Sequence, residues 1–580
     1  MGDTSVDRGA RLLIPLLALL LIAPLLVRGC SCGHDFDFHL LSWIEAAQQI
    51  SHGNLHPHWA YTPAYNAGEP RFVFYPPVSW YLGAGIGLGL EHLPRMTEAA
   101  AWTAAPILFT WIALTLSGLS MFRLARRFAG ANAALLASAV YLASPYMLFT
   151  AFERTAYAEL LAAAWIPLLL EAVLRERPTI PGVAIPVALL WLTNAPAAVM
   201  GCYALALLTA VRLCVEIFAS GAIIVERDAA LRLSAQISGG ATLGLALAAF
   251  YIVPAAWERR YVQAAMATVG GMSIGENFLF EHTGSSPDDL LHDQVLHTAS
   301  VIAVMTLVVT FTALVLLALR RMKAASRQTR LLLPLLVLTA AISFALTPAS
   351  AAIWRITPEA IYLQFPWRLL AVLAPAGALA IAIHLVQIER GLRHAHVALT
   401  AIILVAALGL PAWHLFRQSC DPEDTAAARV ALFHSHAGTD PTDEYTPTAA
   451  DNDALQPGNA PFWIGNSPTA PPPPGHPAGP APMHLRVDAP RAESLVLNLR
   501  NYPAWRITRT TDGSTAQIIA AREPRPDGLV AIEVPAGNSI IDIHYAHTFD
   551  ETLGDLISLC ALVIAALLLR ARYPSAATRP

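Results

Sequence analysis

The sequence has 580 residues, of which 55% are hydrophobic and 13% are charged, and its formal net charge is -4. Soluble proteins carry roughly 25% charged residues, so this composition, with a mean hydropathy of +0.50, excludes an ordinary soluble protein. It indicates a polytopic protein whose first partner is the lipid bilayer, and a charge so near zero gives no reason to expect a nucleic acid partner.

The chain opens with an apolar run over 12–27 that follows two arginines. Both a signal peptide and a first transmembrane helix carry such a run. Because Arg28 makes the following Gly-Cys pair a poor lipoprotein cleavage site, and no other site follows cleanly, we predict an uncleaved transmembrane helix over 1–28.

Further along the chain, eleven stretches come near the roughly 20 apolar residues that a membrane helix needs. They are 99–119, 130–148, 157–174, 179–193, 195–215, 232–253, 297–319, 331–347, 367–388, 395–414 and 553–570. The shorter, glycine-rich stretch 78–90 is predicted to be an interfacial helix. The sequence thus predicts about twelve transmembrane helices, with a helical core over 99–414 and a last helix and tail over 553–580.

Basic clusters set the predicted topology, because cytoplasmic loops carry an excess of arginine and lysine. With 78–90 left out of the count, every cluster falls on the cytoplasmic side. The clusters lie at 123–127, 175–177, 320–330 and 570–572. Both termini are then cytoplasmic, and 29–98 and 415–552 are extracytoplasmic.

The segment 415–552 is predicted to be a domain of its own. A proline-rich stretch over 457–482 is typical of an extended linker. Alternating apolar runs over 484–548, separated by turns such as Asp512-Gly513 and Asp527-Gly528, predict a small antiparallel sandwich. The predicted fold is therefore a polytopic α-helical membrane protein with a C-terminal extracytoplasmic β-sandwich-like domain.

Three of the six cysteines lie in the predicted outer segments, and the other three lie in apolar stretches where small buried hydrophobes are expected. In an oxidising compartment, Cys420 can form a disulfide with either Cys30 or Cys32. The spacing does not choose between these two partners.

Two carboxylates, Asp35 and Asp37, follow the first span directly. Such a pair can bind a hard divalent cation such as Mg²⁺ or Mn²⁺, and one member can act as a general base toward an acceptor hydroxyl. A solvated loop with scattered acids is the alternative. The flanking histidines, His34 and His39, favour a functional site, so both aspartates are predicted as catalytic residues and as candidate metal ligands.

Two arginines, Arg154 and Arg368, stand at predicted outer ends of spans, where a charge is costly unless it is paired or used. A guanidinium there can hold a lipid phosphate bidentately. The alternatives are an interfacial anchor or an internal ion pair, for example Arg154 with Glu159.

Two further residues are weaker candidates. Arg71 precedes the turn at Tyr75, and Glu258 closes a span on the outer side, where it could line a cavity or cap a helix. The predicted substrate-binding set is His34, His39, Arg71, Tyr75, Arg154, Glu159, Glu258 and Arg368. No Walker loop, dinucleotide fingerprint or nucleophile elbow occurs in the sequence, so no nucleotide cofactor is expected.

At these residues the chain resembles the GT-C glycosyltransferases, polytopic enzymes that take a sugar from a polyprenyl-phosphate carrier. The shared features are an acidic residue after the first helix, Gly-Asn-Leu-His-Pro over 53–57, an aromatic-Pro-Pro turn over 75–77, and the span ending Arg-Arg-Phe-Ala-Gly over 126–130.

A bacterial group of membrane proteins labelled "6-pyruvoyl-tetrahydropterin synthase-related", near relatives of the YfhO-type proteins, is more similar still. The motifs are Gly33-His34-Asp35 with His39, Arg154 with Glu159, and the segments 365–368, 443–447 and 501–505. The label does not denote an activity, because nothing in this chain resembles a pterin synthase.

The resemblance implies a glycosyltransferase of the bacterial inner membrane that uses a polyprenyl-phosphate sugar and an extracytoplasmic glycan, lipid or protein acceptor. It makes Asp35 or Asp37 the catalytic acid: Asp35 fits the spacing to His39, and Asp37 fits the spacing to 53–57 slightly better. Many GT-C enzymes carry Glu-Lys before the two prolines where this chain has Phe-Tyr, which shifts phosphate binding to Arg368 or Arg154.

A second hypothesis is a non-catalytic, transport or scaffold protein that keeps the architecture and binds a lipid-linked glycan. The two hypotheses differ in what they require of the carboxylates. Convergence of Asp35, Asp37 and an arginine on one outward cavity would favour the enzyme, whereas carboxylates dispersed over the surface would favour the binding protein.

Overall fold

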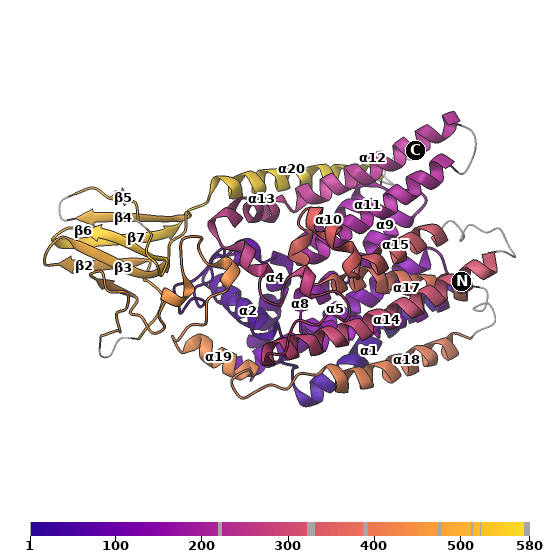
Figure 1. Ribbon diagram of the computed structural model, residues 1–580, viewed down its shortest axis with the longest axis horizontal. Coiled ribbons are helices and arrows are strands. Elements are labelled where there is room, and N and C mark those ends of the chain that lie inside the picture. The colour runs from indigo at the N-terminus through magenta and orange to yellow at the C-terminus, as the bar shows by residue number, and fades with distance from the viewer. Residues whose placement is uncertain are drawn as a thin grey trace.

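A helical bundle makes up most of the protein, and a β-domain lies at one end of it, as the computed structural model shows (Figure 1). The structure describes residues 2–218, 223–321, 331–386, 393–473, 477–511, 514–521 and 524–572. The first helix begins and the last helix ends at the end of the bundle away from the sheets. The polytopic helical fold with a C-terminal β-region is thereby confirmed.

Eight helices or helix pairs among the described residues are long and apolar enough to cross a membrane, and three bent pairs raise the number to as many as eleven. The eight belong to α1 (Gly2–Arg28), α5 (Glu98–Arg126), α8 (Tyr157–Ala162) with α9 (Ile166–Leu174), α11 (Ala195–Phe218), α14 (Pro287–Arg321), α17 (Leu370–Leu385), α18 (His394–Phe416) and α20 (Phe549–Arg572). The bent pairs join α6 (Ala131–Leu142) to α7 (Pro145–Phe152), α12 (Ile223–Leu247) to α13 (Ala249–Glu258), and α15 (Leu332–Ala345) to α16 (Ala351–Ile356). With the shorter apolar helix α10 (Ile180–Thr193), each of the twelve predicted stretches contains a helix.

Proline explains one break that matters for the site. Pro145 has no N–H to donate and disfavours the helical conformation in the residue before it, so α6 ends and α7 starts anew at a bend of 43°. The Ser144 hydroxyl caps the new helix by accepting from Met147 N–H at 3.4 Å. This short helix ends at Phe152, so the following segment, 153–156, lies at the end of the bundle nearer the sheets.

The outer segment 29–98 contains a helix that the sequence did not predict, α2 (Phe36–Ser51), followed by the single turn α3 (Arg71–Phe74). The middle of α2 is buried on all sides, since every residue over 39–47 is buried, and Trp43 stacks on Phe109 of α5 with ring centroids 4.8 Å apart. The stretch predicted as an interfacial helix forms α4 (Pro77–Glu91); its position at a membrane interface stays a prediction.

Within the part of the chain that the structure describes, seven strands form two antiparallel sheets at the end of the bundle (Figure 1). The strands are β1 (Phe462–Ile464), β2 (His484–Ala489), β3 (Glu493–Arg500), β4 (Trp505–Thr511), β5 (Gln517–Ile519), β6 (Leu529–Val534) and β7 (Gly537–Tyr545), in the orders β1-β3-β6 and β2-β7-β4-β5. Alternating side chains of both sheets enter one core, which is the pattern of a sandwich.

Short elements complete the outer end of the molecule. They are α19 (Ala426–His434) and the 3-10 turns at Arg259–Tyr261, Ala264–Thr268, Ile274–Glu276, Pro348–Ser350, Ala360–Leu363, Pro366–Leu369, Asp443–Tyr445 and Asn452–Ala454. The stretch 457–482, predicted as a linker, holds β1. The predicted turn at 512–513, most of the basic cluster at 320–330 and the tail 573–580 lie outside the described residues.

Aromatic rings join the first outer segment to the β-domain. The Trp59 ring lies 5.5 Å from the Tyr502 ring and 5.2 Å from the Trp505 ring, measured between centroids. Residues far apart in sequence therefore share one apolar core. This contact fixes the β-domain over the loops that carry the candidate site.

Candidate functional site

A cavity of about 1050 Å³ lies where the first outer segment, the turn after α7, the start of α14 and the turn before α17 meet. It brings together seven of the ten residues that the sequence nominated: His34, Asp35, His39, Tyr75, Arg154, Glu159 and Arg368. Glu444 and Tyr445, from the segment that leads to the β-domain, also line it.

Asp35 enters the cavity because the backbone before it lies directly against the turn after α7. Its N–H donates to the Arg154 carbonyl at 2.9 Å. A Cβ at position 33 would lie only 2.1 Å from the Glu153 carbonyl oxygen, so this close approach requires Gly33. Asp35 occupies the N-cap position of α2, but its carboxylate makes no capping hydrogen bond. The 42% exposed side chain is therefore available to a ligand.

Two arginines share one buried carboxylate on the wall beside Asp35. Arg154 Nη1 donates to Glu159 Oε2 at 2.7 Å, and Arg368 Nε lies 3.4 Å from the same oxygen. The hydroxyl of Tyr146 donates to the other oxygen of Glu159. Burial lowers the pKa of Arg154, but attraction to Glu159 more than offsets this, so the guanidinium stays charged. The internal ion pair between Arg154 and Glu159 that the sequence left open is present.

Ring stacking and a backbone contact hold the two guanidinium groups in place. Arg154 lies 5.0 Å from the Trp367 ring centroid, and Arg368 lies 4.9 Å from that of Phe365. Arg368 also donates to the Leu363 carbonyl at 3.0 Å. Asp35 approaches Arg154 only to 3.9 Å. The wall therefore carries two fixed positive charges, one buried negative charge and one loosely held carboxylate.

His39 and Tyr75 form a buried pair behind Asp35, with 2.5 Å between His39 Nδ1 and the Tyr75 hydroxyl. Burial lowers the pKa of His39 to about 4, so the ring is neutral at pH 7. Burial also raises the pKa of Tyr75 and lowers that of His34. None of the three adds a positive charge for a ligand, and the charged groups on this side are Asp35 and the arginines.

Three nominated residues do not line the cavity. Asp37 points toward α19, where its carboxylate lies 3.7 Å from Arg429 Nη2. Arg71 is one layer behind the wall: it pairs with Glu69 at 2.8 Å and lies over the Phe38 ring. The third, Glu258, accepts a hydrogen bond from the Tyr502 hydroxyl at the junction with the β-domain.

The separation of the two aspartates bears on the predicted metal. Residues two apart on a helix point to nearly opposite sides, and Asp35 and Asp37 accordingly face different arginines, Arg154 and Arg429. Among the described residues, no three His, Cys, Asp or Glu side chains are grouped so that they could hold a metal ion. The Asp-x-Asp pair therefore does not fit a shared divalent cation in this arrangement.

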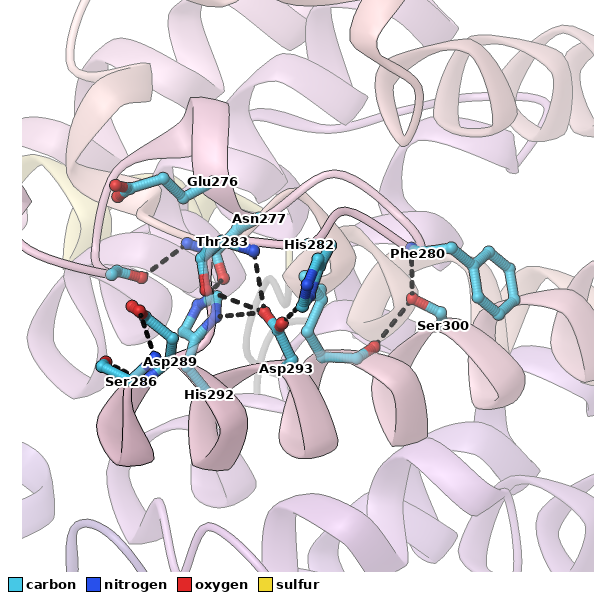
Figure 2. A network of polar contacts seen from close by, with 12 residues as sticks. Glu276, Asn277, Phe280, His282, Thr283, Ser286, Asp289, His292, Asp293 and Ser300 are labelled. Carbon is cyan, nitrogen blue, oxygen red and sulfur yellow. Dashed lines mark hydrogen bonds and ion pairs between the residues drawn. The ribbon is translucent and has the colours of Figure 1, made fainter.

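The opposite wall comes from the loop over 270–283 and the first turns of α14 (Figure 2). Asn277 donates to the Gly271 carbonyl at 2.7 Å, and its side-chain oxygen lies 3.1 Å from His292 Nε2. Asp293 accepts from the N–H and the hydroxyl of Thr283 at 3.1 and 2.8 Å. These bonds fasten the loop to the helix.

This second wall adds carboxylates that sequence reasoning missed. Glu276, Asp288 and Asp289 line the cavity, as does Glu444, whose pKa is raised by burial. Glu444 could have been predicted as a site residue, because it belongs to the motif over 443–447 that carries part of the sequence resemblance. For Asp288 and Asp289 there was no signal: the sequence predicted the span to begin at 297, whereas α14 begins at Pro287. Its apolar helix of 33 residues is well over the roughly 20 that a span needs.

A disulfide anchors the chain just before Asp35. Cys32 is bonded to Cys420, which settles the alternative that the sequence left open, while Cys30 is free and buried. The bond joins the end of the first span to the segment after α18 across 388 residues. Burial raises the pKa of the Cys30 thiol to about 12, which leaves it protonated and unreactive.

No protein-family model and no curated protein matches the chain. Among solved structures, the apo oligosaccharyltransferase of Archaeoglobus fulgidus is 14% identical with a TM-score of 0.41, over 73% of this chain and 56% of that one. Arabinofuranosyltransferase AftD from mycobacteria, in a mutant form, is 16% identical with a TM-score of 0.39, over 70% and 28%. ArnT from Cupriavidus metallidurans, bound to undecaprenyl phosphate, is 13% identical with a TM-score of 0.35, over 74% and 77%.

This chain thus spans just over half the length of the archaeal oligosaccharyltransferase. The likenesses are weak, with identities of 13% to 16% and TM-scores of 0.35 to 0.41. The closer resemblance to the "6-pyruvoyl-tetrahydropterin synthase-related" group stays a prediction.

Proposed function

We propose that this protein is a membrane glycosyltransferase that moves a sugar from a polyprenyl-phosphate carrier to an acceptor hydroxyl. The observation that carries the proposal is the convergence of Asp35 with Arg154 and Arg368 on one cavity. A carboxylate and two guanidinium groups are the parts that such a transfer needs: a base for the acceptor, and positive charge for the phosphate that leaves.

The charge of the cavity wall favours an anionic ligand. Arg154 and Arg368 are 4% and 9% exposed, and the buried carboxylate between them, Glu159, balances one of the two positive charges. The second has only a loose counter-charge, because Asp35 comes no closer than 3.9 Å to Arg154. An unbalanced charge in a buried site is costly unless a counter-ion reaches it. The phosphate of the carrier lipid supplies that counter-ion and can accept from both guanidinium groups.

The same arrangement frees the base when the carrier binds. The carboxylate of Asp35 is the second negative charge near Arg154, at 3.9 Å. A phosphate bound to Arg154 takes over that role, and Asp35 can then accept the proton of the acceptor hydroxyl. The oxygen forms its bond to the anomeric carbon of the sugar, while the bond to the phosphate oxygen breaks and both electrons stay with the phosphate.

The proposed location is the extracytoplasmic face of a bacterial inner membrane, with both termini cytoplasmic. The disulfide between Cys32 and Cys420 lies beside the cavity, and disulfides persist in oxidising compartments. The arginine cluster over 123–127 ends α5 at the other end of the bundle, which suits the cytoplasmic side. The carboxylates of the α14 wall and Glu444 would hold the acceptor.

Sugar transfer from radiolabelled polyprenyl-phosphate hexoses by the purified protein tests the proposal. Asp35→Asn should lower turnover at least about a hundredfold, the usual effect of removing a general base, without weakening carrier binding. Asp37→Asn is the matched control and should leave turnover within a few-fold of the original. An EDTA arm tests for a divalent cation separately.

Two results would contradict this function. Equal turnover by the Asp35→Asn variant and the unchanged protein would show that Asp35 is not the general base. No turnover with any carrier, together with saturable carrier binding that Asp35→Asn does not alter, would favour the alternative of a transport or scaffold protein for a lipid-linked glycan.

A further inference from the structure

A second pocket, of about 550 Å³, lies between α1 and α5 at the end of the bundle that carries the start of α1 (Figure 1). Its lining is Asp7, Arg11, Leu119, Phe122, Arg123, Arg126 and Arg127. The proposed transfer reaction uses none of these residues. They include Arg126 and Arg127, the Arg-Arg pair at the end of a span that formed part of the sequence resemblance. This pair does not line the cavity near the sheets.

Helix geometry explains why these side chains meet. Asp7 and Arg11 are four residues apart on α1, and Leu119, Phe122 and Arg126 follow at intervals of three and four on α5. Residues at these intervals share one helix face. The two faces look toward each other, and the pocket between them has apolar side chains on the side of the bundle and guanidinium groups toward the helix ends.

Part of the positive charge in the pocket is already paired. Arg126 donates two hydrogen bonds to the Asp7 carboxylate, at 2.8 and 3.2 Å, and these connect α1 to the end of α5. It also donates to the Ala129 carbonyl at 3.0 Å. Arg123 and Arg127 both bind Glu171, at 2.7 and 2.6 Å. The carboxylate that they share is almost fully buried, with 4% of its side chain exposed.

The remaining positive charge exceeds the negative charge among the described residues. Arg11 has no ion-pair partner there, and Arg123 and Arg127 share the single carboxylate of Glu171. The side chains of Arg123 and Arg127 are 63% and 49% exposed, which leaves several of their N–H groups free to turn toward the pocket. Arginine donates to phosphate oxygens in the same forked geometry as to carboxylates.

We propose that this pocket binds the headgroup phosphate of an anionic membrane phospholipid. Its position favours a lipid over a dissolved phosphate, because Leu12 and Leu16, one and five residues beyond Arg11 on α1, are 68% and 58% exposed and form an apolar surface that faces outward. A lipid can lay its chains along that surface while Arg11 and Arg123 hold its phosphate. Basic pockets between membrane helices bind lipid headgroups in this way.

Native mass spectrometry of the purified protein, titrated with phosphatidylglycerol and separately with phosphatidylcholine, tests the proposal. The expected result is preferential retention of phosphatidylglycerol, weakened about thirtyfold in the Arg11→Gln/Arg123→Gln variant, since each basic residue at an anionic lipid contributes about fivefold. Arg570→Gln is the matched control, because this arginine is also exposed at an end of a span, and it should leave retention unchanged.

The single variant Arg11→Gln controls for misfolding of the double variant, because it breaks no ion pair within the described residues. It should still weaken the retention of phosphatidylglycerol about fivefold. Equal retention by the double variant and the unchanged protein would overturn the proposal. So would displacement of phosphatidylglycerol by inorganic phosphate or glycerol phosphate at matched concentration, because the pocket would then be a site for a dissolved anion.

Discussion

Arg154 and Arg368 are 4% and 9% exposed, share Glu159 and lie against aromatic rings, whereas Arg123 and Arg127 share Glu171 with side chains 63% and 49% exposed. Both sites place two guanidinium groups on one buried carboxylate. In the first, the guanidinium groups are buried and their interactions with charges are correspondingly stronger; in the second, solvent reaches the guanidinium groups. The same pairing pattern is therefore compatible with the proposed transfer reaction at one end of the bundle and with the proposed lipid binding at the other.

The sharpest way to separate the two sites is to neutralise one arginine in each. Arg368→Gln should lower kcat by about a hundredfold to a thousandfold, because a fixed donor to developing negative charge is worth that much in a dry site. Arg123→Gln should leave kcat unchanged. Steady-state kinetics with the carrier lipid measures both, and equal losses in the two variants would mean that neither arginine contacts the leaving phosphate.

Stability provides the next contrast. Arg154→Gln should lower the free energy of unfolding by about 3 kcal/mol, because it leaves the buried carboxylate of Glu159 with a single, more distant arginine. Arg127→Gln should cost less than about 1 kcal/mol, as expected for an exposed ion pair. Melting temperatures in one detergent would test this order, and a larger fall for Arg127→Gln would contradict it.

The disulfide sharpens the comparison further, since it lies beside the first site only. Cys32→Ser should lower the free energy of unfolding by about 2 kcal/mol, toward the low end of the range for disulfides, and it should also reduce turnover, because the chain just before Asp35 loses its anchor. Cys214→Ser, at an exposed free cysteine on α11, is the control. Unchanged turnover in Cys32→Ser would show that the contact of Gly33 with Glu153 positions Asp35 without help.

The smallest expected effect is a dependence on pH that reaches only the first site. His39 has its pKa lowered to about 4, against about 6.5 in the unfolded chain. Between these values the unfolded chain binds a proton that the folded one does not, so the stability present above pH 6.5 declines as the pH falls toward 4. Melting temperatures over this range should fall less steeply for His39→Gln, while phosphatidylglycerol retention stays constant because arginine does not titrate.

Much of the fold could be predicted from the sequence because spans and strands leave local patterns. Each of the twelve predicted stretches contains a helix, and the apolar runs near 495, 518, 529 and 540 became β3, β5, β6 and β7. The prediction missed α2, whose 16 residues are fewer than a span needs and include polar groups along their whole length. It also missed β2 and β4, whose outward faces are polar or charged. Strands that bury only one face leave a weaker trace in composition than spans do.

The candidate site was predictable as a set of residue types but not as an arrangement. The sequence nominated Arg154 and Arg368 because charges at the ends of spans are costly, and it nominated Asp35 and Asp37 because two carboxylates beside histidines can act as a base or hold a metal ion. It added Arg71 for its place before a turn and Glu258 for its place at the end of a span. Three of these residues, Asp37, Arg71 and Glu258, lie outside the cavity. Nothing in the local sequence separates these three from the residues that line it, because all of them are charged groups near the end of a predicted span.

About a dozen apolar segments and a C-terminal β-rich region could be deduced from the order of residues alone, since hydropathy and alternation are summed over neighbouring residues. The pairing of Cys420 with Cys32 rather than Cys30, and the position of Asp35 rather than Asp37 beside Arg154, emerge only from the folded chain. Both choices depend on segments that meet across more than a hundred residues, and on a backbone contact at Gly33 that leaves no room for a side chain. Such contacts are a property of packing, which no local pattern encodes.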